Sequence, residues 1–349
     1  MQKASKSAFI RKIKRFPVFF AALALAFAAF GCTSGSEPVK REVFAMDTHM
    51  NIICYGSRAE SAADAAIDEI RRIDSLLSIQ STSGSIYRVN ESGSASVGDE
   101  TAKLVEYALE LHNDTGGAFD VTVLPLMKLW GFTSGEYRVP SEAEIAAVLA
   151  CIGSEKLSLS GEKLDLGDAL GIDLGGIAKG YTSDRLTELF RQRGITSACV
   201  SLGGNVQCLG AKPDGSAWRC AILHPFNKDS GEYLGIVSVI DKAVITSGAY
   251  ERNFTDEKTG KLYHHIIDPK TGFPAESGLA SVTIVSDSGV LADTLSTACF
   301  IMGLEGSIEF WKTSGYDFEM ILMSDDGEIH ITSGLSESFT SDHDINVIN

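Results

Sequence analysis

The chain has 349 residues, of which 44% are hydrophobic and 22% charged, a composition typical of a folded globular protein and not of a disordered one. Its formal net charge of −16 argues against a protein that binds nucleic acid or an anionic lipid surface. For the same reason, a phosphate-bearing ligand would need a metal cation or backbone donors to offset the protein's own field. The seven cysteines include no CxxC pair, which argues against a zinc site built from them.

Residues 1–31 are predicted to be a secretory signal rather than part of the fold. Residues 1–15 carry basic side chains and no acid, and the apolar run PVFFAALALAFAAF follows them. This run is too short for a comfortable transmembrane span, and Cys32 directly after Gly31 resembles a bacterial lipobox. We expect Cys32 to be lipidated and residues 32–42 to be a tether, with the protein exported and anchored in a membrane, facing the periplasm or the cell exterior. An ordinary signal peptide followed by a chance cysteine is the alternative.

Helices are predicted in the first half of the remaining chain. Apolar residues recur at helical spacing, and Ser141 with Glu144 forms the pattern of a capping box after Pro140. A strand is expected at MNIICYG, residues 50–56, and a loop over residues 81–99, which are rich in Ser and Gly. The predicted helices cover residues 61–78, 101–117, 142–149 and 179–194.

The second half of the chain is predicted to be rich in strands. Residues 319–332 indicate a hairpin with Asp326 and Gly327 at its turn. Helices and strands are interspersed without a strict βαβ rhythm, and no linker is evident. These features favour an α+β fold for residues 43–349, with largely antiparallel sheet layers flanked by helices. The other strand-like runs of this half are residues 197–202, 217–225, 234–248 and 279–288.

One helix pattern, ADTLSTACFIMG at residues 292–303, combines an apolar run with two polar side chains. Asp293 and Thr297 are four residues apart and therefore share one helix face. A carboxylate and a hydroxyl are both hard oxygen donors and suit Mg²⁺. The alternative is that Asp293 interacts with the helix dipole and Thr297 bonds back to its own helix.

The stretch DLGGIAKGYTSD, residues 173–184, indicates a turn between a strand-like GIDL and a helix. Paired glycines there let backbone approach a ligand, and the helix start offers free N–H groups to phosphate. Lys179 adds a positive charge. The pattern matches neither the Walker loop nor GxGxxG, so by itself it indicates no more than a tight turn.

Taken together, six ordered motifs closely resemble the ApbE family of FAD:protein FMN transferases. The resemblance runs from about Val43 to about Ile331 and implies an ApbE-like fold. The motifs are AFDVTVLPLMKLWGF (118–132), DLGGIAKGY (173–181), SLGGNV (201–206), TSGAYERNF (246–254), HHIIDPKTG (264–272) and ADTLSTACFIMG (292–303).

The resemblance implies an enzyme that uses Mg²⁺ to cleave FAD, its substrate. Family members transfer FMN to a Ser or Thr hydroxyl of an exported or membrane flavoprotein and release AMP. By the matching motif, Asp293 and Thr297 would ligate the metal, together with the backbone carbonyl of Gly176. His265 would transfer a proton or orient phosphate, although an aspartate remains the alternative base.

The resemblance also implies a set of flavin contacts. His265 belongs to that set as well, and Asp268 would brace the turn that follows it. One departure concerns the loop after the first helix, where many family members carry an aromatic residue that stacks on the cofactor. Here Gln80 stands at the nearest position, and the sequence leaves open whether Tyr87 substitutes for it. The remaining expected contacts are Met46, Ala118, Phe119, Asp120, Asp173, Lys179 and Ile266.

Two other functions remain open from sequence. An FAD pyrophosphatase would use the same metal site with water as the acceptor and release FMN and AMP. A non-catalytic flavin-binding lipoprotein would store or deliver the cofactor, but it would not need a metal beside the pyrophosphate.

Overall fold

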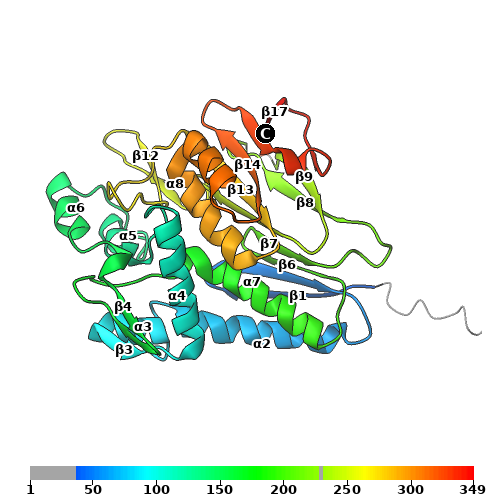
Figure 1. Cartoon of the computed structure of the whole chain (residues 1–349), viewed down its shortest axis with the longest axis horizontal. Helices are drawn as coiled ribbons and strands as arrows, with labels where there is room; N and C mark the ends of the chain where they lie inside the picture. The colour runs from blue at the N-terminus through cyan, green and yellow to red at the C-terminus, as the bar shows by residue number, and fades with distance from the viewer. Residues whose placement is uncertain (1–36, 228–230) are drawn as a thin grey trace, which may run out of the picture.

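A nine-stranded sheet is the frame of this computed structural model, which describes residues 37–227 and 231–349 (Figure 1). Neighbouring strands are antiparallel, except that β15 and β17 are parallel. The predicted α+β fold with a largely antiparallel sheet is therefore confirmed. In sheet order the strands are β1 (Val39–Ala45), β2 (Thr48–Cys54), β6 (Ala198–Leu202), β7 (Asn205–Leu209), β10 (Ala243–Gly248), β13 (Leu279–Ser286), β14 (Glu319–Ser324), β15 (Ile329–Thr332) and β17 (Ile345–Ile348).

Three long helices cover one face of this sheet (Figure 1). Ile70 and Phe190 pack with Ile52 of β2, and Leu295 packs with Ile284 of β13, all of them fully or almost fully buried. Burial of these apolar stripes stabilises both layers, because each large side chain contributes roughly 1.5–3 kcal/mol when removed from water. The helices are α2 (Ala59–Leu77), α7 (Gly175–Gln192) and α8 (Gly289–Thr313).

A smaller sheet covers the opposite face at the C-terminal half. Val285 of β13 and Ile321 of β14 pack there against Val237 of β9. Successive residues of a strand point to opposite faces, so a strand covered on both sides is buried throughout. This explains why every residue of β13 is buried. The small sheet has the order β16 (Phe339–Thr340), β9 (Tyr233–Val239), β8 (Trp218–Leu223).

Shorter elements complete the structure beside the helical face. They include a three-stranded sheet of order β3-β5-β4 and a hairpin of β11 with β12. The helices are α3 (Ser85–Ser92), α4 (Asp99–Asp114), α5 (Leu124–Trp130) and α6 (Glu142–Leu149), with 3-10 turns η1 (Val121–Val123), η2 (Ser154–Lys156) and η4 (Ser333–Leu335). The strands are β3 (Ser94–Ser96), β4 (Ser158–Ser160), β5 (Lys163–Asp165), β11 (Asn253–Thr255) and β12 (Leu262–His264).

The loop predicted over residues 81–99 is wrong, because α3 and β3 lie within it. Ile86 and Val89 are three residues apart and fully buried, so they give this short helix its apolar face. The Ser85 hydroxyl, also buried, bonds to the Leu76 carbonyl at 3.0 Å and to the Thr101 hydroxyl at 2.9 Å. A serine-rich composition therefore concealed a packed helix whose buried serine is hydrogen-bonded.

The strand predicted at GIDL is also wrong. Residues 171–174 belong to no strand, and the Asp173 N–H donates to the Val121 carbonyl of a 3-10 turn at 2.7 Å. The helix that follows begins at Gly175, four residues before the predicted start. Both glycines of the motif therefore belong to the first turn of α7 rather than to a loop.

Several local predictions are confirmed. Ser141 and Glu144 form both hydrogen bonds of the capping box at the start of α6, and the hairpin of β14 with β15 turns at Asp326 and Gly327. Within the described ranges, none of the helices is both long and apolar enough to cross a lipid bilayer. The predicted lipidation residue, Cys32, lies outside the described residues.

Candidate functional site

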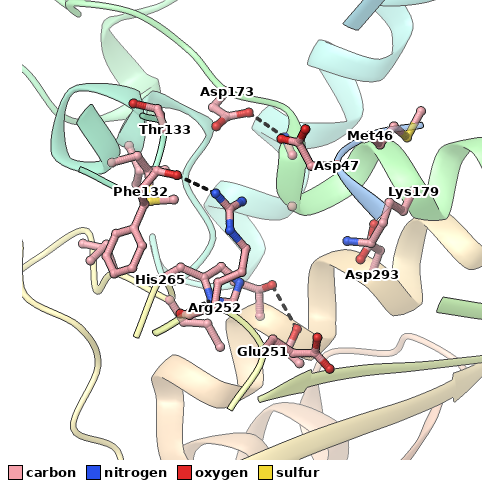
Figure 2. A pocket seen from close by; sticks show the side chains of 18 of the residues that line it. Met46, Asp47, Phe132, Thr133, Asp173, Lys179, Glu251, Arg252, His265 and Asp293 are labelled. Carbon is pink, nitrogen blue, oxygen red and sulfur yellow. Dashed lines mark hydrogen bonds between the residues drawn. The ribbon is translucent and has the colours of Figure 1, made fainter. Parts of the chain in front are cut away.

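A cavity of about 650 Å³ opens where α7 and α8 meet the ends of β7 and β10 (Figure 2). Its size is in the range of cofactor sites. A second cavity of about 370 Å³ shares part of its lining, including Met46, Gln80 and Arg252, so the two adjoin. Every flavin and metal residue predicted from the sequence lines the larger cavity: Met46, Gln80, Ala118, Phe119, Asp120, Asp173, Gly176, Lys179, His265, Ile266, Asp293 and Thr297.

Asp293 is held in one orientation by two hydrogen bonds. The side chain is 4% exposed; Oδ1 accepts from Asn205 Nδ2 at 2.8 Å, and Oδ2 accepts from the Gly180 N–H at 2.8 Å. Asn205 follows the two-glycine turn of the β6–β7 hairpin, where Gly203 and Gly204 both have positive φ. A carboxylate has about four lone-pair sites, so Asp293 keeps acceptor capacity on the cavity side.

Thr297 lies one turn further along α8 and also faces the cavity. Its hydroxyl is 3.4 Å from the Ser247 hydroxyl of β10, which in turn is 2.7 Å from the Ser296 hydroxyl. The neighbouring Ser296 bonds back to the helix, to the Asp293 carbonyl at 2.8 Å. Within the described residues Thr297 is thus paired across to the sheet rather than to its own helix.

Close contact between α7 and α8 fixes the position of Asp293 relative to the glycine turn. A Cβ on Gly180 would lie 2.2 Å from the Gly289 carbonyl oxygen and 2.6 Å from Asp293 Cβ, distances that no side chain tolerates. The Asp184 carboxylate accepts the N–H groups of Gly289 at 2.7 Å and Val290 at 2.9 Å, so a residue of α7 caps the start of α8. The two helices are therefore in direct contact where they line the cavity.

The carbonyl of Gly176 is the third oxygen predicted to bind metal. In a regular helix its donor would be the N–H of Gly180, which here donates to Asp293. A carbonyl oxygen has two lone pairs, so Gly176 can accept a further partner from the cavity. A Cβ at this position would lie 3.1 Å from the Phe119 ring, so a side chain there would require a small shift of that ring. The three oxygens are all hard donors, which fits Mg²⁺ and not a soft metal.

The charge lining the cavity is unbalanced. Among the described lining residues, five carboxylates face only two permanent cations, Lys179 and Arg252. A ligand with a doubly charged pyrophosphate would be repelled by this surplus unless a divalent cation accompanies it. The carboxylates belong to Asp47, Asp120, Asp173, Glu251 and Asp293.

Arg252 is the main functional candidate that the sequence reasoning missed. It lines both cavities and donates from Nη2 to the Phe132 carbonyl (Figure 2). A guanidinium is permanently charged and offers several donors, so it is suited to phosphate oxygens. The signal was available, since Arg252 stands inside the motif TSGAYERNF.

The imidazole of His265 is neutral in this environment. Burial, followed by the positive charges of Arg252 and Lys179, lowers the pKa of His265 to about 3. Its Nδ1 lies 3.2 Å from the Arg252 carbonyl, an acceptor, so Nδ1 carries the proton and Nε2 has a free lone pair. With this tautomer, Nε2 can accept a hydrogen bond from a ligand in the cavity.

We expect the pH dependence of stability to report this lowered pKa. An unfolded histidine titrates near 6.5, so between about pH 6.5 and pH 3 the unfolded chain binds a proton that folded His265 does not. Acidification through this window therefore favours unfolding. In His265→Gln the melting temperature should fall less steeply over the same range, measured by thermal denaturation. Equal slopes in both proteins would contradict the lowered pKa.

Asp173 and Lys179 lie at the start of α7. Asp173 Oδ1 accepts the Gly175 N–H at 2.8 Å and so caps the first turn, while burial raises the pKa of its carboxyl group. Figure 2 shows Lys179 beside Asp293 on one side of the cavity and Arg252 with His265 on the other. A bound phosphate chain would therefore meet positive charge from both sides.

The Asp120 carboxylate is engaged within the protein. It accepts hydrogen bonds from the Thr122 hydroxyl at 2.6 Å and the Ser154 hydroxyl at 2.8 Å, and His112 Nδ1 lies 3.3 Å away. Asp120 is buried and therefore braces the AFD turn, whose other residues, Ala118 and Phe119, line the cavity. A direct contact of Asp120 with flavin stays a prediction.

Among its described lining residues, the cavity lacks the aromatic residue that the family resemblance implied for the position of Gln80. Gln80 is exposed and lines both cavities, whereas Tyr87 is not among the described lining residues. Tyr137 does line the larger cavity, is 43% exposed and stacks on Phe254 with ring centroids 5.1 Å apart. Tyr137 thus offers an aromatic surface that the sequence did not single out.

A cofactor-sized cavity lined by hard oxygen donors and two cations is typical of an enzyme that handles a phosphate-bearing ligand. A protein-family comparison places the chain within that class. The chain belongs to the ApbE family, whose model matches residues 46–322.

Curated relatives and solved structures agree with this assignment. FAD:protein FMN transferase from Vibrio cholerae is 32% identical over 335 residues, covering 92% of this chain and 98% of the relative. The protein of that name from Escherichia coli is 34% identical over 264 residues, covering 72% and 74%. The crystal structure of the Thermotoga maritima ApbE protein has a TM-score of 0.79 at 30% identity, covering 85% of this chain and 98% of that one. The Vibrio cholerae flavin transferase ApbE has a TM-score of 0.75 at 29% identity, covering 86% and 99%.

Proposed function

We propose that this protein is an FAD:protein FMN transferase that depends on Mg²⁺ and uses a Ser or Thr hydroxyl of a partner flavoprotein as acceptor. The acceptor oxygen would form a bond to the phosphorus of the FMN half of FAD, the pyrophosphate P–O bond would break, and AMP would leave. The acceptor hydroxyl would lose its proton. The observation that carries the proposal is that Asp293, Thr297 and Gly176 line one cavity together with Lys179 and Arg252.

Each residue has a role that follows from its position. Asp293, Thr297 and the Gly176 carbonyl would hold Mg²⁺, which when bound supplies Lewis acidity and neutralises pyrophosphate charge. Lys179 and Arg252 would orient the phosphates from opposite sides. Nε2 of His265 carries a free lone pair and would accept the proton of the acceptor hydroxyl once bound phosphate offsets the neighbouring cations that lower its pKa. Phe119 and Tyr137 would contact the flavin or adenine rings.

The proposal includes a location. A lipid on Cys32 would anchor the protein in a membrane, facing the periplasm or the cell exterior. The tether would be shorter than the predicted residues 32–42, because β1 begins at Val39. The acceptor would then be an exported or membrane flavoprotein. Support comes from the signal-like sequence of residues 1–31 and the lipobox-like Gly31 and Cys32.

The proposed reaction is tested by mass spectrometry. The chain from residue 33 onward is incubated with FAD, Mg²⁺ and a flavoprotein domain that offers a Ser or Thr acceptor. A mass increase of one FMN on that residue, lost on addition of a chelator, is the expected result. Formation of free FMN and AMP without an adduct would show that the protein acts as an FAD pyrophosphatase and not as a transferase. FAD that remains bound and intact would show that the protein carries flavin without cleaving it.

Arg252→Gln should weaken FAD binding. A hydrogen bond to a charged group is worth about 1.5–3 kcal/mol, so the Kd for FAD should rise roughly tenfold to a hundredfold. Titration of flavin fluorescence measures this Kd directly. Arg191→Gln is the matched control, since Arg191 pairs with Asp241 on the surface, away from the residues that line the cavity. If both variants bind FAD like the parent, Arg252 does not contact the phosphates.

A further inference from the structure

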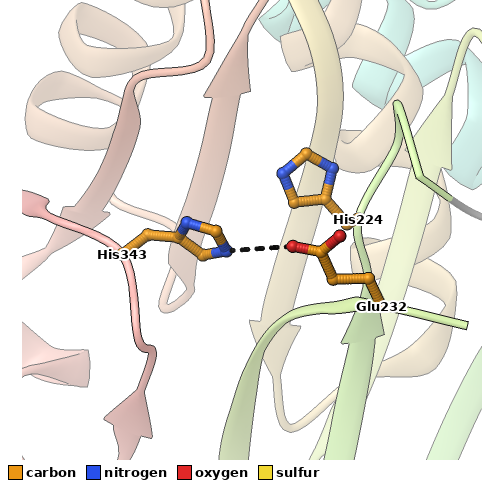
Figure 3. A group of neighbouring side chains, drawn as sticks. All are labelled: His224, Glu232 and His343. Atoms are coloured by element: carbon orange, nitrogen blue, oxygen red, sulfur yellow. Dashed lines mark ion pairs between the residues drawn. The ribbon is translucent and has the colours of Figure 1, made fainter. Parts of the chain in front are cut away.

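Three potential metal ligands from separate segments meet outside the cavity described above. His224 follows β8, Glu232 precedes β9, and His343 lies between β16 and β17. One ligand atom from each side chain lies within 4.8 Å of the other two. Figure 3 shows the His224 ring near the Glu232 carboxylate, with the His343 imidazole approaching the same carboxylate. None of these residues lines the larger or the smaller cavity.

His224 carries an unsatisfied nitrogen. The residue is 8% exposed, and its Nδ1 is buried without a hydrogen-bond partner among the described residues. A buried polar atom left without a partner is costly, by about 1–3 kcal/mol, so a native structure rarely keeps one without a reason. The His224 and His343 rings are close, with centroids 5.4 Å apart, and no hydrogen bond joins them in the described part of the chain. A cation bound at His224 Nδ1 would satisfy the nitrogen that is left without a partner.

The carboxylate of this cluster is already oriented. Glu232 Oε2 accepts from Asn227 Nδ2 at 2.7 Å, while Oε1 lies 3.8 Å from His343 Nε2. Two ligands bonded to one zinc ion at about 2.0–2.2 Å are roughly 3.4 Å apart in a tetrahedral site. The Glu232 and His343 side chains are 43% and 38% exposed, so small rotations would close the remaining gap and water could occupy a fourth position.

The geometry points to a binding site for one borderline divalent ion, Zn²⁺ in the first instance, at His224, Glu232 and His343. Two imidazoles and a carboxylate are the ligand set of many zinc sites. Mg²⁺ prefers oxygen ligands alone, so this site and the cluster at Asp293 select different ions. Asn227 acts as the outer partner that fixes the carboxylate.

The position of His343 gives the ion a structural consequence. β16 pairs with β9 in the small sheet, while β17 pairs with β15 in the large sheet, so the segment between them passes from one layer to the other. An ion bound there would link the segment between β16 and β17 to the end of β8 and the start of β9. Any ligand that binds only the folded state stabilises it by mass action, so Zn²⁺ should raise the melting temperature.

The test measures Zn²⁺ binding by competition with a chromophoric chelator, on untagged protein in excess Mg²⁺ so that the Asp293 cluster is not the site detected. We expect one Zn²⁺ per chain and a higher melting temperature with Zn²⁺. Loss of an outer-shell partner already costs about 10–100-fold in metal affinity, so His343→Gln and Glu232→Gln should each weaken binding at least about tenfold. Both residues are partly exposed, so these variants should fold.

His49→Gln is the matched control, because His49 is an exposed histidine that contacts the Phe44 ring on another part of the sheet. This variant should bind Zn²⁺ like the parent. Unchanged affinity in both His343→Gln and Glu232→Gln would place the ion elsewhere and overturn the site. Absence of stoichiometric Zn²⁺ binding by the parent protein would overturn it as well.

Discussion

Asp293→Asn should abolish Mg²⁺-dependent release of AMP from FAD. Asparagine has the shape of aspartate but lacks its charge, and its single carbonyl oxygen cannot both ligate a cation and accept from Gly180 and Asn205. Removing one electrostatic stabiliser of a transition state typically costs roughly 10²–10³-fold in rate, and losing the metal should cost at least as much. Chromatographic quantification of AMP measures the effect.

The control for this prediction is Asp68→Asn, which removes one carboxylate from an exposed position on α2. That variant should release AMP at the parent rate. Asp293→Asn should also be assayed for thermal stability, because a buried donor without its acceptor costs about 1–3 kcal/mol. A folded Asp293→Asn protein that still releases AMP with Mg²⁺ would exclude Asp293 as a metal ligand.

Gly180→Ala should destabilise the protein and impair its activity together. The added Cβ would collide with the Gly289 carbonyl and with Asp293, so α7 and α8 would have to separate. Overpacking of this kind costs about 1–3 kcal/mol in the free energy of unfolding, and displacement of Asp293 should reduce AMP release. Urea denaturation monitored by circular dichroism gives the free energy, and the AMP assay gives the activity.

Whether Gly180→Ala lowers or raises the free energy of unfolding shows whether α7 and α8 are in close contact. Alanine is a better helix former than glycine by about 1 kcal/mol in a helix interior, so Gly180→Ala would stabilise α7 if the helices were not in close contact. A stabilised, fully active variant would therefore show that the tight approach of α7 to α8 is unimportant. A destabilised variant with normal activity would separate helix packing from the position of the metal oxygens.

Local signals explain which parts of this structure the sequence could predict. The capping box at Ser141 and the turn at Asp326 and Gly327 depend on a few neighbouring residues, and both were correctly placed. The face shared by Asp293 and Thr297 follows from helix periodicity alone, and both side chains do reach one cavity. Patterns confined to one turn or one helix face need no knowledge of the tertiary fold.

Long-range partners explain what the sequence could not predict. The short helix α3 lies inside a Ser-rich segment. Its buried Ser85 hydroxyl bonds to the Leu76 carbonyl and the Thr101 hydroxyl, contacts that no local pattern reveals. Likewise, the position of Asn205 as the partner of Asp293 depends on how β7 lies beside α8. The resemblance to the ApbE family grouped the motifs, but the cation pair across the cavity became evident only in three dimensions.

The hydrogen bond from Gly180 to Asp293 joins residues 113 positions apart in the chain. Ordering so long a loop is entropically costly until the strands between its ends have paired, so we expect this contact to form late in folding. A partly folded chain would therefore hold the individual motifs without the assembled cluster of oxygens. FAD cleavage would then be confined to molecules that have completed folding.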